Sequence, residues 1–208
     1  MNNKKRAETD IAIIFDLGRV LIDVDFTRGL FKYYQRDGFH RESEIIERIF
    51  RDDLFIAFAT GKLSPHKLYK SLIQKYKLSL AYDQFVKEWC DIFSPMDGME
   101  ELVREIAAHY PIGLLSDTDP LHWNYCLQTY PYLNLFKRPT LSYEVGALKP
   151  DPICYLTAAK NIGKQPQACL FIDDREINVN GARRAGMKSI QFIGVDELKD
   201  ELFKIQIL

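Results

Sequence analysis

The sequence Ile11-Ala-Ile-Ile-Phe15 is followed at once by Asp16-Leu-Gly18. A continuous apolar run rich in β-branched residues is typical of a strand that is buried on both faces of a parallel sheet. Asp16 then stands at the carboxyl end of this strand. Ligands of open α/β sheets bind outside the carboxyl ends of the strands, so Asp16 is placed where chemistry is expected.

Similar apolar runs recur later in the chain, over residues 112–115, 139–142, 168–172 and 189–193. Helical patterns separate them, including one that begins at Pro152 and one over residues 177–185. Strands that alternate with helices through short connections favour a doubly wound α/β fold with a mostly parallel sheet.

The stretch from about residue 26 to residue 93 has a different pattern, with several amphipathic helices and no strand-like run. Ser64-Pro65 has the form of a helix start, and Leu68, Leu72 and Tyr76 follow at intervals of four. We therefore predict an α/β core over residues 8–24 and 95–208, with an all-helical cap over residues 25–94 inserted into it.

The composition describes an ordinary globular chain. It has 208 residues, of which 47% are hydrophobic and 27% charged, so disorder is excluded as the main state. The 28 basic and 29 acidic residues leave a net charge of −1, which favours neither a nucleic acid nor a membrane surface as partner. No apolar segment follows the basic residues near the start, and the four cysteines form no CxxC pair, so we expect a reducing cytoplasm.

Polar side chains gather at the predicted strand ends. Besides Asp16 they include Ser116 and Asp117 after the second strand and Asp173 and Asp174 after the fourth, with Lys149 between them in sequence. Carboxylates this close raise one another's pKa unless a cation compensates them. Mg²⁺ is the simplest candidate for this cation, because it binds carboxylates together with substrate phosphate. One carboxylate could then act as a nucleophile, with Lys149 and Ser116 binding the phosphoryl group.

Four segments together resemble the motifs of the haloacid dehalogenase (HAD) superfamily, in the branch that carries a helical cap. They occur in the family's order and span nearly the whole chain after the first ten residues. The segments are Phe15-Asp-Leu-Gly-Arg-Val-Leu-Ile-Asp23, Leu114-Leu-Ser-Asp117, Lys149-Pro-Asp151, and Phe171-Ile-Asp-Asp174 with Asn178 and Ala185-Gly186.

The resemblance implies a role for each motif residue. Asp16 would be the nucleophile and a Mg²⁺ ligand, and the backbone carbonyl of Gly18 and the carboxylate of Asp174 would be further ligands. Lys149, Ser116 and Asp117 would bind the substrate. Asp173 would orient Lys149 or a water on the metal, and Asn178 stands where many relatives carry a second acid.

Gly18 departs from the family pattern. Most phosphatases of the superfamily carry a second aspartate two residues after the nucleophile, and general acid–base help is typically worth about 10² to 10⁴ in rate. Three alternatives remain open. The leaving group departs without protonation, as from an anomeric sugar phosphate or an acyl phosphate. Another group, such as Asp117 or a cap residue, supplies the proton. Or the protein binds phosphorylated ligands with little turnover.

The segments Leu17-Gly18, Leu115-Ser-Asp-Thr-Asp119 and Ile172-Asp-Asp174 resemble a branch, similar to the bacterial α-glucose-1-phosphate phosphatases, that also has glycine at this position. We therefore predict a Mg²⁺-dependent phosphatase that hydrolyses a small phosphorylated metabolite, a sugar phosphate, through an aspartyl-phosphate on Asp16. The rival from another class is a weakly active or non-catalytic phosphate-binding protein. A dehalogenase is a further alternative, although its attack on carbon needs neither a metal nor the Asp173-Asp174 pair.

His122 and Trp123 either line the substrate entrance or pack a helix start on the sheet.

Overall fold

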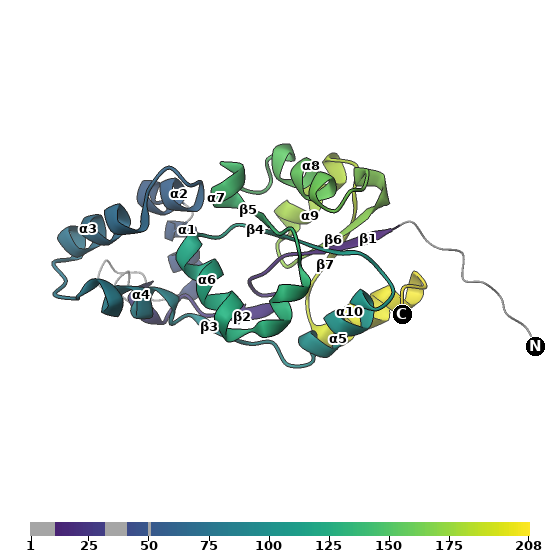
Figure 1. Ribbon diagram of the computed structural model, residues 1–208, viewed down its shortest axis with the longest axis horizontal. Helices are drawn as coiled ribbons and strands as arrows, with labels where there is room; N and C mark the ends of the chain where they lie inside the picture. Colours follow the sequence, from purple (N-terminus) through teal and green to yellow (C-terminus); the bar gives the residue numbers. More distant parts are fainter. Residues whose placement is uncertain (1–10, 32–40, 50) are drawn as a thin grey trace, which may run out of the picture.

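The computed structural model describes residues 11–31, 41–49 and 51–208 (Figure 1). Residues 8–10 of the predicted core, and residues 32–40 and 50 of the predicted cap, lie outside the described part. Within that part, no helix combines the length and the apolar character that crossing a membrane requires. The four cysteines are buried and free.

A five-stranded parallel sheet forms the centre of the molecule, in the order β5-β4-β1-β6-β7. The strands are β1 (Ala12–Phe15), β4 (Ile112–Ser116), β5 (Thr140–Leu141), β6 (Cys169–Asp173) and β7 (Lys188–Gln191). All four residues of β1 are 0% exposed, as expected for the central strand. The predicted doubly wound α/β fold is thus confirmed.

The register of β1 brings the strand ends together. Phe15 is paired with Leu114 of β4 on one side and with Ile172 of β6 on the other. The residues that follow these three positions therefore emerge at one edge of the sheet, which is why polar groups far apart in sequence meet there.

Helices cover both faces of the sheet (Figure 1). Ile13 and Phe15 face one cluster, built with α5 (Met99–Ala107), α6 (Pro120–Thr129) and α10 (Val195–Lys204). Ile14 faces the opposite cluster, built with α8 (Pro152–Asn161) and α9 (Glu176–Arg184). Successive side chains of β1 thus point to opposite faces of the sheet, and a separate layer of helices covers each face. Shorter elements complete the core: η2 (Pro131–Leu135), α7 (Ser142–Val145) and η3 (Pro166–Ala168).

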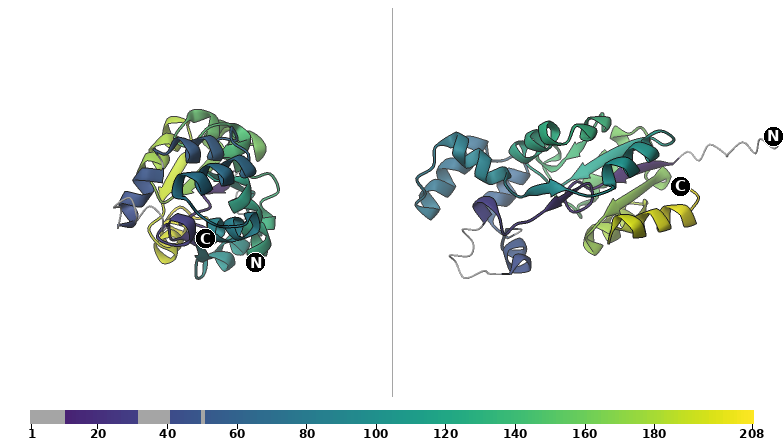
Figure 2. Two further views of the ribbon diagram at one scale, coloured as in Figure 1. Left: turned by 90° about the vertical axis from the view of Figure 1, so that its left-hand side faces the viewer. Right: turned by 90° about the horizontal axis from the view of Figure 1, so that it is seen from below.

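An antiparallel pair of short strands, β2 (Ile22–Val24) and β3 (Phe93–Pro95), joins the sheet region to a group of helices. These are α1 (Glu42–Ile49), α2 (Asp53–Ala59), α3 (Pro65–Tyr76) and α4 (Tyr82–Cys90). Figures 1 and 2 show them at one end of the molecule, beyond the carboxyl end of β1. The sequence did not predict the strand pair, because three residues are too few for a recognisable alternation.

The helices between β2 and β3 have an apolar cluster of their own. Its buried members include Phe31, Phe58, Leu68, Phe85 and Trp89. Helix α3 begins as the sequence predicts, with the hydroxyl of Ser64 accepting from the backbone N–H of Lys67 at 3.4 Å and proline in the first turn.

Candidate active site

Asp16 lies directly after β1, and its backbone N–H donates to the carbonyl of Ile172 at 2.9 Å. The Nζ atom of Lys149 is 2.7 Å from Oδ1 of Asp16 and 2.7 Å from Oδ2 of Asp173. All three residues are less than one-tenth exposed. One ammonium group therefore bridges two buried carboxylates at the edge of the sheet.

Asp173 is fully buried, and both its carboxylate oxygens are occupied by protein donors. Oδ1 accepts from the backbone N–H of Arg175 at 2.8 Å and from Nδ2 of Asn178 at 3.0 Å, while Oδ2 accepts from Lys149. Asp173 thus fixes the position of Lys149. The Oδ1 atom of Asn178 is buried and has no hydrogen-bond partner within the described part of the chain.

Burial raises the pKa of Asp16 well above its usual range, and the carboxylates of Asp173 and Asp174 raise it further against the opposing effect of Lys149. Burial also raises the pKa of Asp174 and of Asp117. For Lys149, burial alone would lower the pKa, but Asp16, Asp173 and Asp117 outweigh it and the net pKa is raised. Burial and mutual repulsion therefore oppose the ionisation of these carboxyl groups in the metal-free fold, against the opposing effect of Lys149, Arg19 and Arg175.

The donor set fits a hard divalent cation. One carboxylate oxygen from each of Asp16, Asp173 and Asp174 lies within 4.8 Å of the others. Oxygen ligands at such spacing suit Mg²⁺. Because protein donors already occupy Asp173, Asp16 and Asp174 remain as the carboxylates for a metal. Asn178, whose Oδ1 has no hydrogen-bond partner among the described residues, lines the same cavity.

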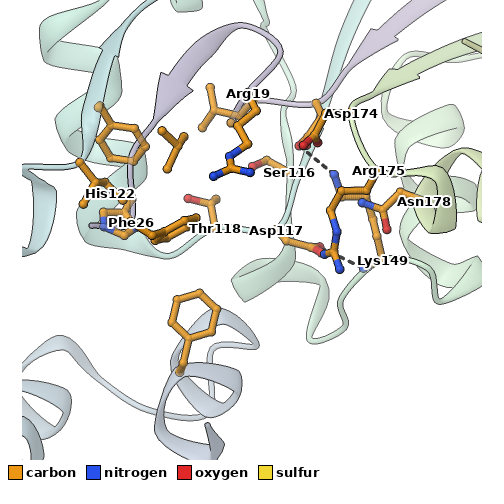
Figure 3. A pocket seen from close by; sticks show the side chains of 17 residues that line it. Arg19, Phe26, Ser116, Asp117, Thr118, His122, Lys149, Asp174, Arg175 and Asn178 are labelled. Carbon is orange, nitrogen blue, oxygen red and sulfur yellow. Dashed lines mark hydrogen bonds and ion pairs between the residues drawn. The ribbon is translucent and has the colours of Figure 1, made fainter. Parts of the chain in front are cut away.

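A cavity of about 170 Å³ opens in front of these groups (Figure 3). Of the residues predicted for the site, all but Asp173 line it: Asp16, Gly18, Ser116, Asp117, Lys149, Asp174 and Asn178. Asp117 also accepts from the backbone N–H of Lys149 at 3.0 Å, which ties the two predicted substrate-binding segments together. The structure thus places the predicted site residues around one small volume.

His122 both lines the cavity and belongs to the start of α6, so the two alternatives that the sequence left open do not exclude each other. Its Nδ1 lies 2.8 Å from Oδ2 of Asp119, and its Nε2 lies 2.9 Å from the carbonyl oxygen of Trp89. Asp119 also accepts from Nε1 of Trp89 at 3.1 Å. Trp123 is buried in the core and does not line the cavity.

Sequence reasoning did not identify several other residues that line the cavity: Leu17, Arg19, Val24, Phe26, Phe55, Ile92, Phe93, Thr118 and Arg175. Most lie outside the four motifs, and three of them lie on β2, α2 and β3 (Val24, Phe55 and Phe93). Leu17 and Arg19 lie inside the first motif. Thr118 directly precedes Asp119-Pro120, a typical helix N-cap followed by proline, which fixes where α6 begins.

Comparisons with known proteins agree with this geometry. The chain is 23% identical over 186 residues to the D-ribitol-5-phosphate phosphatase of Bacteroides thetaiotaomicron, covering 86% of this chain and 90% of that protein. It is 32% identical over 130 residues to flavin mononucleotide hydrolase 1 of Arabidopsis thaliana, covering 55% of this chain and 47% of that protein.

Among solved structures, a HAD family enzyme of Bacteroides thetaiotaomicron in complex with magnesium and inorganic phosphate is similar with a TM-score of 0.74 and 25% identity. The similarity covers 87% of this chain and 93% of that chain. The family model of the haloacid dehalogenase-like hydrolases matches residues 12–186. The chain is therefore an enzyme of the haloacid dehalogenase-like hydrolase family.

Proposed function

We propose that this enzyme is a Mg²⁺-dependent phosphatase that hydrolyses a small phosphorylated metabolite of the sugar-phosphate type through an aspartyl-phosphate on Asp16. The observation that carries the proposal is the pair of 2.7 Å contacts by which Lys149 bridges Asp16, which lines the cavity, and the fully buried Asp173. The named activities of the two curated relatives, on D-ribitol 5-phosphate and on flavin mononucleotide (FMN), support a small phosphate ester as substrate.

The carboxylates of Asp16 and Asp174 and the backbone carbonyl of Gly18 would hold the metal. When bound, Mg²⁺ compensates the carboxylates and draws negative charge from the phosphoryl oxygens. Asp173 keeps the ammonium of Lys149 in place, through the 2.7 Å contact between them. The buried Oδ1 atom of Asn178 is available as an acceptor in the occupied site.

In the first step, a carboxylate oxygen of Asp16 attacks phosphorus, and the bond from phosphorus to the leaving oxygen breaks. Lys149 and Ser116 lie where they can stabilise charge on the phosphoryl oxygens. In the second step, water attacks the same phosphorus atom. The bond to Asp16 breaks, inorganic phosphate leaves, and the carboxylate of Asp16 is restored.

The proton for the leaving oxygen comes from water in this proposal, because Gly18 supplies no acid. The hydroxide left behind takes up the proton that the attacking water releases in the second step. Asp117 lines the cavity, and its pKa is raised by burial, but its Oδ1 already holds the backbone of Lys149. We therefore assign Asp117 to positioning the lysine loop. A sugar-like substrate whose leaving group departs readily suits such a site.

We propose further that α1 to α4 act as the cap over residues 25–94 and keep bulk solvent from the site. Buried contacts join them to the core, and His122 also meets the carbonyl oxygen of Trp89 at 2.9 Å. The Ser142 hydroxyl donates to the carbonyl of Ala59 at the end of α2 at 2.7 Å, and Trp89 of α4 donates to Asp119.

The buried, free cysteines suit the reducing cytoplasm that the sequence predicts.

Phosphate release from a panel of sugar, sugar-alcohol, acyl and flavin phosphates, measured with Mg²⁺ and with EDTA, tests the proposal. We expect turnover that needs Mg²⁺ and disappears in Asp16→Asn. Asp23→Asn is the matched control, because Asp23 is an exposed aspartate of β2 that does not line the cavity. Phosphate-ester binding without release from any member of the panel would instead favour a non-catalytic binding protein.

A further inference from the structure

The cavity has two unlike ends (Figure 3). Asp174, Lys149 and Asn178 lie at one end, and Phe26 and His122 at the other. We call the second end the aromatic wall and define it by six residues that line the cavity: Val24, Phe26, Phe55, Ile92, Phe93 and His122. A substrate that places its phosphate by Lys149 turns its leaving group toward this wall.

Two of the three phenylalanine rings of the wall, Phe26 and Phe93, are held by other aromatic side chains. Phe26 meets Phe31 edge-to-face with centroids 5.1 Å apart, and Phe93 stacks on Tyr125 at 5.9 Å. Phe26, Phe55 and Phe93 are nevertheless only half-buried, so part of each ring surface is left for a ligand. Fixed rings with an uncovered surface suit another flat ring, which they can meet stacked or edge-to-face.

The six residues of the aromatic wall themselves offer a ligand little hydrogen bonding, although the guanidinium carbon of Arg19 lies 6.0 Å from the centroid of the Phe26 ring beside them. Five of the six residues are apolar, and both ring nitrogens of His122 already face protein oxygens, on Asp119 and Trp89. Hydroxyl groups placed here would lose hydrogen bonds to water without gaining partners, which is costly. A bare sugar therefore fits against these six residues poorly, whereas the face of an aromatic ring carries no hydrogen-bonding group and loses little on contacting them.

We infer that the preferred substrate carries a flat aromatic or heteroaromatic ring, joined to the phosphate by a short flexible linker. The inference rests on the proposed phosphatase function. It keeps the small phosphate ester but replaces the bare sugar with a ring on an alkyl chain, a leaving group that takes its proton from water. FMN and D-ribitol 5-phosphate form a matched pair of probes, because both present a primary phosphate on a ribityl chain. Only FMN carries a ring. Because the same kind of bond breaks in both esters, a difference in kcat/KM reports contacts with the ring.

The test compares kcat/KM for the two esters in wild type, Phe26→Leu and Phe55→Leu. Leucine keeps apolar volume but removes the ring. We expect FMN to be preferred by about tenfold or more in wild type, and the preference to fall about two- to tenfold in each variant. Phe203→Leu is the control, since Phe203 is 72% exposed on α10 and does not line the cavity. Equal or better hydrolysis of D-ribitol 5-phosphate by wild type would overturn the inference.

A binding measurement separates this inference from the proposed function. FMN is added to Asp16→Asn, which is expected not to turn it over, and binding is read from flavin fluorescence. Saturable quenching that weakens several-fold when Phe26→Leu is added supports the aromatic wall, even if wild type hydrolyses neither ester and the phosphatase proposal fails. Absence of FMN binding, or binding that Phe26→Leu and Phe55→Leu leave unchanged, overturns it.

Discussion

A Cβ atom added to Gly18 would lie 3.0 Å from Cγ2 of Val24. Val24 is the last residue of β2, is 7% exposed and lines the cavity. The space that a side chain at position 18 needs is thus taken by an apolar residue that the β2–β3 pair holds in place. The packing around position 18 therefore fits glycine, and a larger residue at this position requires the side chain of Val24 to move.

The first prediction concerns this pair. Gly18→Asp combined with Val24→Ala makes room for the carboxyl group and supplies the absent acid. We expect alkyl phosphates, which have poor leaving groups, to be hydrolysed at least about tenfold faster than by Val24→Ala alone. Hydrolysis of p-nitrophenyl phosphate, whose leaving group needs no proton, should change little. Unchanged rates for alkyl phosphates would show that Asp117 or another group already supplies the proton.

The second prediction concerns Lys149. Lys149→Met leaves Asp16 and Asp173 buried without their shared cation, which should lower the free energy of unfolding by about 3 kcal/mol and abolish phosphate release. Urea unfolding at neutral pH in EDTA measures the loss. Lys199→Met is the control, because Lys199 is 45% exposed and its 3.7 Å pair with Asp196 should contribute less than about 1 kcal/mol. A Lys149→Met protein as stable as wild type would contradict the bridging role.

The third prediction concerns pH and Mg²⁺. The pKa values of Asp16 and Asp174 are raised in the metal-free fold, chiefly by burial. The folded state therefore holds more protons than the unfolded state, in which these pKa values are about 3.9. As the pH rises from about 4 through the raised values, these two groups make the metal-free protein less stable.

Mg²⁺ replaces those protons, so its stabilising effect should grow as the pH rises. We expect about 2.7 kcal/mol at neutral pH and a Mg²⁺ concentration of about 100 times Kd, and a smaller gain at about pH 5. Denaturation with Mg²⁺ and with EDTA at both pH values measures the difference, with Asp174→Asn expected to lose most of it. The prediction is wrong if Asp174→Asn keeps the full gain, or if the gain is larger in acid.

The fourth prediction concerns the contact between α4 and the core. Asp119 is 1% exposed and accepts from Trp89 and His122 through Oδ2, while Oδ1 accepts from the backbone N–H groups of Leu121 and His122. Asp119→Asn keeps the helix cap through its amide oxygen, but it places the amide NH₂ group against the donors of Trp89 and His122. We expect a loss of about 1–3 kcal/mol in the free energy of unfolding and a raised KM.

Asp151→Asn provides the comparison for Asp119. Asp151 caps α8 by accepting from Ile153 at 3.0 Å on the exposed surface, and asparagine caps a helix about as well as aspartate. Both KM and stability should stay near wild type in this control. If Asp119→Asn behaves like Asp151→Asn, the hydrogen bonds to Trp89 do not hold α4 to the core.

The groups that meet at the strand ends were predictable because their signals are local. Each of Asp16, Asp117 and Asp173 follows or ends an apolar run, and the parallel sheet brings such positions to one edge. The aromatic wall was not predictable in this way. Phe26, Phe55 and Phe93 share no motif or periodicity, and they meet only through the packing of α1 to α4 against the core, which depends on contacts between distant segments. The boundaries at residues 24–25 and 94–95 remain a prediction.

Trapping of the phosphoenzyme tests the central role of Asp16 most directly. The enzyme is mixed with Mg²⁺ and a substrate identified in the panel, quenched in acid within a single turnover, digested, and analysed by peptide mass spectrometry. We predict a phosphoryl group on the peptide that contains Asp16, and none in Asp16→Asn. A phosphoryl group on another residue, or undiminished phosphate release by Asp16→Asn, would contradict an aspartyl-phosphate at Asp16.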